Sequence, residues 1–320
     1  MIEKKLHLSK IHLSLLVNDA AGNKDTDADV ANIRSRIEKR VQRFTLRPIA
    51  PHADVAEVAC SAVQDGADIV AVLGGDGTQS TVAGALAGGS AIMAVLPGGT
   101  FNYFARELGM GNDLDQALDV LEAAYVKSID LGEVNGRVFL NNASFGVYPA
   151  ILERREAIYR QWGRSRLMAY WSVAVTLADM RHPMRLRVTS GAVIRKFVTP
   201  LAFAARSSYQ IESFGLEGAE AVRSGHFALF IARSTRRRDL AAAALRLALG
   251  MAVKGTDFEM VVADDILIES DRARRLLAFD GEKEWMPGPW HLKLRRQDLR
   301  VIVPPPDVNA AEPEAGQSAA

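Results

Sequence analysis

The chain has 320 residues, of which 48% are hydrophobic and 24% charged, and its formal net charge is +1. This length and apolar content predict two modest domains with buried cores, and so small a net charge disfavours nucleic acid as a partner. The single cysteine excludes an internal disulfide framework, and the apolar stretch 167–178 is shorter than the roughly 20 residues of a membrane-spanning helix, so we expect a cytoplasmic protein.

The first part of the chain alternates short apolar runs with segments of helical periodicity. This alternation predicts a parallel sheet covered by helices on both faces, that is, an α/β domain over residues 1–127. The expected strands are 11–18, 67–75 and 91–99, and the expected helices are 29–44, 53–66, 80–89 and 113–127.

From about Ser128 the pattern changes to alternating strands, beginning with an Asn-Gly hairpin signal at Asn135. We therefore expect a mostly antiparallel domain over 128–294, with the segment 295–304 returning to the first domain and a disordered tail over 305–320. The expected strands are 184–190, 226–233, 257–270, 274–282 and 290–296, and the expected helices are 150–180 and 238–255.

Two glycine-rich segments, GGDGT at 74–78 and PGGTFN at 97–102, follow consecutive predicted strands. Ligands of open parallel sheets bind outside the carboxyl ends of the strands, where glycines let backbone amides approach a phosphate. Thr78 and Thr100 add hydroxyls, and Asp76 adds a carboxylate suited to Mg²⁺ or a phosphate-bound water. The alternative interpretation is a pair of turns in which glycine supplies a positive φ. Two such segments at neighbouring strand ends favour a nucleotide-phosphate site.

These segments, GGDGTQSTVAGAL and LPGGTFNYFARELGM, resemble the catalytic domain of diacylglycerol kinases, soluble bacterial lipid kinases, and sphingosine and ceramide kinases. The resemblance extends to 16–22, 139–149 and FDGE at 279–282. It implies an ATP- and Mg²⁺-dependent kinase that phosphorylates a lipid hydroxyl, with nucleotide in the cleft between a Rossmann-like and a β-sandwich-like domain.

Residue by residue, the resemblance assigns carboxylates to catalysis and a longer set to the nucleotide. Asp280 and Glu282 supply the catalytic carboxylates, and Asp76 acts through magnesium or water. Residues two apart in an extended segment point the same way, so Asp280 and Glu282 are both expected to face the cleft, and either one fits the role of base. The nucleotide set is Asn18, Gly22, Thr45, Gly74, Gly75, Asp76, Gly77, Thr78, Gly98, Gly99, Thr100 and Asn102.

Three positions depart from the family pattern. Ser80 and Thr81 replace an Asn-Glu pair, and Tyr103 replaces an aspartate. The second of the missing carboxylates helps organise a metal-water network in many bacterial members, so Tyr103 leaves the magnesium arrangement open. It also fits a subgroup with a different acceptor.

The second half of the chain is the more basic one, with +6 over 151–320 against −5 over 1–150. Residues 154–166 carry five arginines and one glutamate, with Tyr159 and Trp162 between them. This composition suits a helix lying on an anionic membrane, and an ordinary solvated helix face is the alternative. A position at the inner face of the membrane is therefore expected.

Other functions stay open beside a lipid kinase. NAD kinase-like and phosphofructokinase-like enzymes also use a Gly-Gly-Asp-Gly core, although PGGTFNYFAREL differs from the segments that follow it there. A non-catalytic lipid- or nucleotide-binding protein on the same fold would explain the missing carboxylates, whereas the retained Asp76, Asp280 and Glu282 favour catalysis. The sequence leaves open whether the acceptor is diacylglycerol, ceramide or a sphingoid base, and it leaves the oligomeric state open too.

Overall fold

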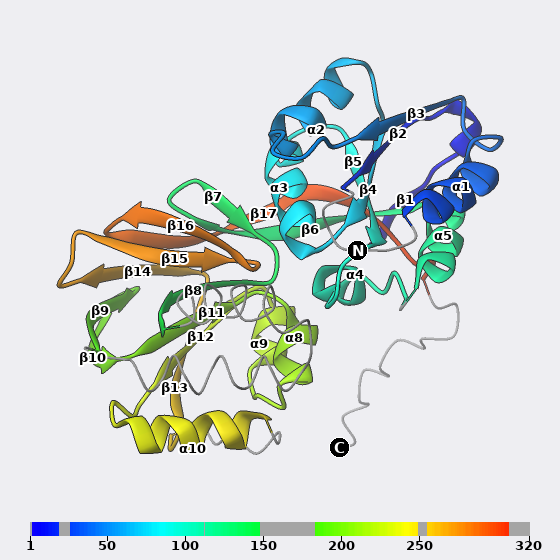
Figure 1. Ribbon diagram of the computed structural model, residues 1–320. Coiled ribbons are helices and arrows are strands. Elements are labelled where there is room, and N and C mark those ends of the chain that lie inside the picture. The colour runs from blue at the N-terminus through cyan, green and yellow to red at the C-terminus, as the bar shows by residue number, and fades with distance from the viewer. Residues whose placement is uncertain (1, 19–25, 112, 148–182, 249–254, 307–320) are drawn as a thin grey trace, which may run out of the picture.

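The computed structural model describes residues 2–18, 26–111, 113–147, 183–248 and 255–306. In this described part of the chain the strands form one 11-stranded and one 6-stranded sheet. Figure 1 shows an α/β domain built from the first part of the chain and a second domain of antiparallel strands beside it. The predicted fold class, an α/β domain followed by a β-sandwich-like domain, is confirmed.

The centre of the first domain is a parallel sheet in the order β5-β4-β2-β3. Every residue of β4 is buried, because helices cover both faces of the sheet, and this explains its continuous apolar sequence. All four strands end at the same edge, where the two glycine-rich segments begin. The strands are β2 (His12–Val17), β3 (Arg43–Pro48), β4 (Ile69–Gly74) and β5 (Ile92–Pro97), with β1 (Ile2–Lys5) pairing elsewhere with β6.

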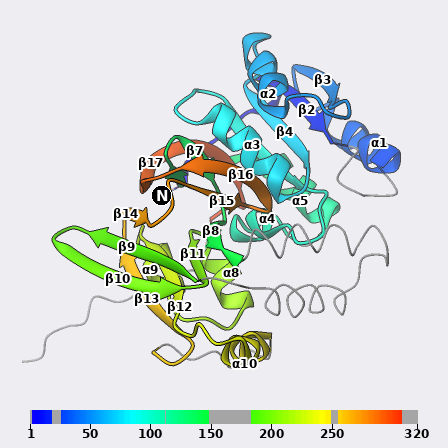
Figure 2. The same ribbon diagram turned by 60° about the vertical axis from the view of Figure 1, so that its left-hand side comes forward.

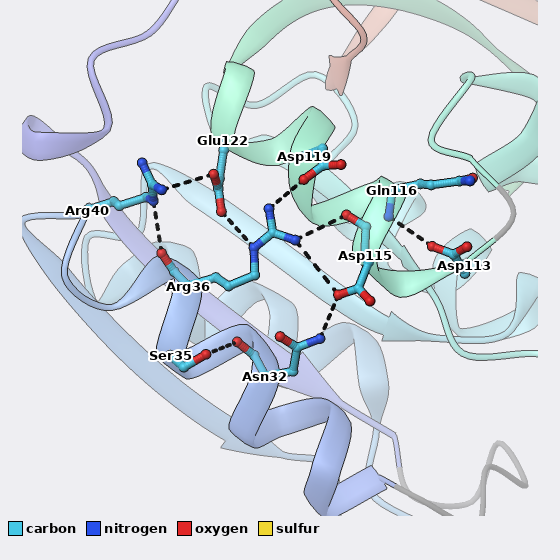
Figure 3. A network of polar contacts seen from close by, with 9 residues as sticks. All are labelled: Asn32, Ser35, Arg36, Arg40, Asp113, Asp115, Gln116, Asp119 and Glu122. Atoms are coloured by element: carbon cyan, nitrogen blue, oxygen red, sulfur yellow. Dashed lines mark hydrogen bonds and ion pairs between the residues drawn. The ribbon is translucent and has the colours of Figure 1, made fainter.

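Two helices of this domain are held together by one arginine (Figure 3). Arg36 of α1 donates to Glu122 at 2.8 Å and to Asp119 at 2.6 Å, both on α5, and Arg40 pairs with Glu122 as well. The network holds α1, from the early part of this domain's sequence, against α5, from its last part. The helices are α1 (Thr26–Ile37), α2 (Val55–Gln64), α3 (Asp76–Leu86), α4 (Tyr103–Glu107) and α5 (Leu114–Ala123), with a 3-10 turn at Leu8–Lys10.

The second domain is a sandwich of two antiparallel sheets around an apolar core that includes Phe139, Phe145, Phe279 and Trp290. One layer has the order β13-β12-β11-β8-β15-β16, and the other includes β10-β9-β14-β17. Its strands are β6 (Tyr125–Val134), β7 (Arg137–Phe139), β8 (Asn142–Gly146), β9 (Met184–Ser190), β10 (Val193–Thr199), β11 (Leu201–Ala205), β12 (Phe227–Ala232), β13 (Phe258–Ala263), β14 (Asp265–Ser270), β15 (Arg274–Phe279), β16 (Glu282–Pro287) and β17 (Trp290–Val303). Its helices are α8 (Ser208–Ser213), α9 (Ala219–Arg223) and α10 (Arg237–Ala248).

Two long strands join the domains (Figures 1 and 2). β17 pairs antiparallel with β14 near its start and parallel with β5 at Arg300 and Val301. β6 runs antiparallel along β17 through both domains, with an irregularity between Arg295 and Leu299. The two domains therefore share one continuous sheet, which fixes the first domain's strand ends relative to the sandwich.

Several predicted boundaries were wrong. The helix expected over 29–44 ends at Ile37, and 43–48 forms β3 because it pairs in register with β2. The helix expected from Ser80 begins at Asp76, directly after Gly75. Strands β10, β11 and β16 were not predicted as separate strands. The helix expected over 150–180 and the tail over 307–320 lie outside the described residues.

Candidate active site

A cavity of about 340 Å³ lies where the first domain meets the sandwich. The start of α3 forms one wall, the residue after β2 and the start of α2 form a second, and the hairpin β15–β16 with the start of β7 closes it. The cavity thus lies at the carboxyl edge of the parallel sheet. Its lining residues are Asn18, Val55, Gly77, Thr78, Thr81, Arg137, Phe279, Glu282, Lys283 and Glu284.

The first turn of α3 gives this cavity unused backbone donors. Gly75 is the N-cap and provides no side-chain hydrogen bond, so the first amides of α3 lack the cap that most helices have. The Thr78 hydroxyl accepts a hydrogen bond from Asn18 Nδ2 at 2.8 Å, and both residues line the cavity. An uncapped helix start with free N–H groups and a positive dipole end is a site for an anion such as a phosphate.

The second glycine-rich segment lies beneath the first. A Cβ on Gly98 would stand 2.9 Å from the Gly74 nitrogen, and one on Gly99 would stand 2.6 Å from the Gly75 Cα. Asn102 closes this segment by accepting from the Gly99 amide at 2.8 Å and donating to the Gly99 carbonyl at 3.0 Å. Gly98, Gly99 and Asn102 are not among the residues that line the cavity, so the second segment supports the first one from behind.

Asp76 begins α3 and turns into the protein. Its Oδ1 accepts hydrogen bonds from the Phe104 amide at 3.1 Å and from Asn141 Nδ2 at 3.2 Å. Burial raises the pKa of Asp76, and the nearby Asp280 acts in the same direction against these hydrogen bonds. Within the described ranges no group of three or more His, Cys, Asp or Glu residues converges as a metal site.

Asp280 is locked into the sandwich. Together with Gly281 it forms a two-residue turn with positive φ at both positions, which joins β15 to β16. Its buried carboxylate accepts from the amides of Leu140 and Asn141 at 2.7 Å and of Asn142 at 3.0 Å, and from the Ser80 hydroxyl. Burial raises the pKa of Asp280, and these hydrogen bonds oppose that shift by stabilising the anion.

Glu282 takes the other direction from the same turn. It is exposed, lines the cavity, and places its Oε1 2.8 Å from where a Cβ on Gly77 would stand. The expectation that Asp280 and Glu282 point the same way was wrong, because Asp280 lies in a left-handed turn and not in an extended strand. Only one of the two carboxylates therefore faces the cavity.

The diacylglycerol kinase catalytic domain profile matches residues 12–134, the segment from β2 to the end of β6 that contains both glycine-rich segments and the start of α3. Residues 12–134 belong to this family. The predicted resemblance to diacylglycerol kinases is thereby confirmed for the part of the chain that carries the motifs.

Sequence relatives and solved structures of diacylglycerol kinases agree with this assignment. A Pseudomonas aeruginosa protein named "Probable lipid kinase YegS-like" is 38% identical over 136 residues, or 42% of this chain and 43% of that protein. A Staphylococcus aureus diacylglycerol kinase is 28% identical over 134 residues, or 41% of this chain and 42% of that one. These matches span less than half of the length of the relatives.

The fold likeness reaches further than the sequence likeness. Two crystal structures from Bacillus anthracis overlay with TM-scores of 0.73 and 0.67, at 20% and 19% identity, each over 92% of this chain and 97% of the other. The second is named a diacylglycerol kinase. At this identity they show that the diacylglycerol kinase fold extends through the sandwich domain.

The positions that depart from the diacylglycerol kinase pattern have defined neighbours. Ser80 donates to Asp280, and the Thr81 hydroxyl donates to the Gly77 carbonyl at 3.1 Å within the cavity wall. Tyr103 stacks on Phe101 with ring centroids 5.5 Å apart. A hydroxyl and an aromatic ring thus occupy places where the pattern has two carboxylates.

The remaining predicted residues are dispersed. Thr45 lies within β3 and contacts His12 Nε2 at 2.9 Å, and His12 is at the amino end of β2, away from the carboxyl ends of the strands. Thr100 is exposed, and Gly22 lies outside the described residues. Sequence reasoning missed Arg137 and Lys283, which bring positive charge to the cavity. Arg137 directly follows the predicted Asn-Gly turn and Lys283 follows FDGE, but neither has a motif of its own.

Proposed function

We propose that the chain is an ATP-dependent kinase that transfers phosphate to the hydroxyl of a lipid. The observation that carries this proposal is the uncapped start of α3, which opens into a cavity whose opposite wall presents Glu282. The wall formed by the start of α3 can bind a phosphate, and the wall that carries Glu282 can bind the hydroxyl that attacks this phosphate. The family of residues 12–134 and the names of the relatives support the same class of reaction.

On the nucleotide side, the first amides of α3 and the Thr78 hydroxyl would hold the phosphates. Arg137 and Lys283 line the same cavity and would balance phosphate charge. These same residues would hold the phosphates of magnesium-bound ATP, and the bound Mg²⁺ would supply further neutralisation of phosphate charge. Because Mg²⁺ usually keeps several waters and bonds to phosphates, this requires no resident metal site at Asp76.

On the acceptor side, we propose that Glu282 is the base that removes the proton from the lipid hydroxyl. An alcohol holds its proton far above neutral pH, so a carboxylate that removes it speeds attack on phosphorus. Glu282 reaches the cavity, whereas both oxygens of Asp280 already accept hydrogen bonds from the backbone. Asp280 would then act as an anchor, because it fixes the segment 140–142 and the turn that carries Glu282.

The acceptor class is a lipid alcohol such as diacylglycerol, ceramide or a sphingoid base. No helix in the described parts of the chain is long and apolar enough to cross a bilayer. We propose that the protein meets its lipid at the inner surface of the membrane.

The test is transfer of labelled phosphate from ATP to these three lipids in mixed micelles. We expect Glu282→Gln to lower turnover by about 10² to 10⁴ while the ATP-induced rise in melting temperature stays. Glu217→Gln is the matched control, because Glu217 is an exposed carboxylate of the second domain outside the cavity lining, and it should stay within a few-fold of wild type.

Asp280→Asn separates the two carboxylates. If Asp280 is an anchor, this variant lowers the melting temperature together with activity. A loss of turnover at an unchanged melting temperature would transfer the role of base to Asp280. A wild-type protein that binds ATP but labels none of the lipids would favour the non-catalytic alternative.

A further inference from the structure

The hairpin β9–β10 forms the outer edge of the large sheet, on the side of the sandwich away from the first domain (Figures 1 and 2). The strands pair in register, with Arg185 opposite Val198, Arg187 opposite Lys196 and Thr189 opposite Ile194. Directly opposed residues lie on one face of a sheet. The hairpin's outer face therefore alternates cationic and branched apolar side chains, while Met184, Leu186 and Val188 on the other face are buried in the core.

This face is basic and exposed. The segment 184–199 contains four basic residues and no acidic one. Ile194 and Val198 are 60% and 54% exposed, among the most exposed large apolar residues in the described chain. Arg187 pairs with Glu269 at 3.7 Å. No ion pair is found for Arg185 or Lys196 among the residues that the structure describes.

The loop between β14 and β15, next to the hairpin, also exposes basic residues. The Asp271 amide donates to the Arg185 carbonyl at 3.3 Å, so the β14–β15 loop borders the hairpin. Arg272 and Arg274 of this stretch are exposed. We call the set Arg185, Arg187, Ile194, Lys196 and Val198 the basic rim.

We propose that the basic rim docks on the surface of an anionic lipid bilayer. Cations beside apolar side chains are typical of surfaces that lie on such membranes, because the cations meet headgroup phosphates while the apolar groups enter the interface. Charges alone would protect an edge strand from pairing with other chains. That protective role does not explain why Ile194 and Val198 stay in solvent beside the cations.

The biological purpose of the rim rests on the function proposed above, because a kinase whose acceptor is a membrane lipid has to reach the membrane that holds it.

The test is co-sedimentation of the full chain, without ATP, with vesicles of phosphatidylcholine alone or mixed with phosphatidylglycerol. We expect binding to the mixed vesicles that weakens with added salt. The double variant Arg185→Glu/Lys196→Glu should bind them at least about tenfold more weakly. Ile194→Ser/Val198→Ser should also weaken binding while leaving the salt dependence in place. Lys39→Glu/Arg43→Glu, which reverses two exposed cations on the first domain, is the matched control and should bind like wild type.

Melting temperatures near the wild-type value would show that the variants are folded. Unchanged vesicle binding in both rim variants would overturn the proposal, as would equal loss in the control variant. A wild-type dimer that Ile194→Ser/Val198→Ser converts to a monomer, without change in vesicle binding, would assign the rim to a second copy instead. Vesicle binding without lipid phosphorylation would count against the proposed function and leave the rim standing.

Discussion

The two glycine-rich segments, 74–78 and 97–102, look equivalent in the sequence but serve different neighbours in the structure. The first runs from the end of β4 into α3 and opens on the cavity with Gly77 and Thr78. The second presses Gly98 and Gly99 against the backbone of the first, and its threonine, Thr100, is exposed. One segment faces the candidate ligand and the other sets its position.

The difference shows two uses of a missing Cβ. Gly74, Gly75, Gly77, Gly98 and Gly99 all have ordinary backbone angles, so a positive φ explains none of them. At Gly98 and Gly99 the absent side chain lets two strand ends approach each other. At Gly77 it leaves room beside Glu282, where a substrate phosphate would come. Glycine is required both where two backbones come into contact and where a ligand comes close to the backbone. The sequence alone does not distinguish these two cases.

The largest effect should follow from filling the contact between the segments. In Gly99→Ala the new Cβ would stand 2.6 Å from the Gly75 Cα, and neither backbone can move aside easily. Overpacking of this kind costs about 1–3 kcal/mol of unfolding free energy. We expect a melting temperature lower by several degrees in calorimetry.

Gly75→Ala is the control from the other side of the same contact. Its Cβ would stand 3.5 Å from the Gly99 Cα, an ordinary van der Waals distance, and its φ of −83° suits any residue. Its melting temperature should stay close to that of wild type. Equal losses of melting temperature in Gly99→Ala and Gly75→Ala would mean that the two segments respond alike to an added methyl group.

The position of the site was predictable because strand ends of a parallel sheet meet at one edge. The apolar run of β4 and the glycines after it predict the edge at which the cavity lies, and the Asn-Gly turn falls where its signal lies. These features depend on residues close together in the chain, which is the range over which sequence patterns carry information.

The orientation of individual side chains was not predictable in the same way. Asp280 is held by amides 138 to 140 positions earlier in the chain, and Asp76 by Asn141, so their direction is decided by tertiary contacts. β3 was missed because pairing with β2 overrides a helical pattern in 29–44. β10 was missed because it is exposed on both faces and lacks the alternation of a half-buried strand.

A smaller effect, on binding and not on folding, should follow from Gly77→Ala in the first segment. The new Cβ would stand 2.8 Å from Glu282 Oε1, the end of a flexible side chain that can turn away. Alanine is also favoured over glycine inside a helix by about 1 kcal/mol, so the melting temperature should hold or rise. The methyl group would occupy the ligand side, and we expect ATP to bind about tenfold more weakly by calorimetric titration. Weakened folding with unchanged ATP binding would make the first segment a structural contact like the second.

The smallest effect concerns Asp76, which belongs to the first segment by sequence but turns toward the residues after the second. Because burial raises its pKa above 3.8 in the folded protein, the native state holds this proton more tightly than the unfolded chain does. The stabilisation that this proton provides is complete below 3.8 and is lost as the pH rises through the folded-state pKa. Asp76→Asn keeps an oxygen for the Phe104 amide and Asn141, but carries no charge at any pH.

The melting temperature of Asp76→Asn relative to wild type should therefore be higher at about pH 7 than at about pH 4. Glu217→Gln, which removes an exposed carboxylate from the second domain, controls for the change in net charge and should show no such trend. A difference that stays flat with pH, or that falls as the pH rises, would mean that the Phe104 and Asn141 hydrogen bonds outweigh burial and hold Asp76 as a stable anion. The Asp76 carboxylate would then be available to a cation. It would count, like Gly77 and Thr78, among the residues of the first segment that face the ligand.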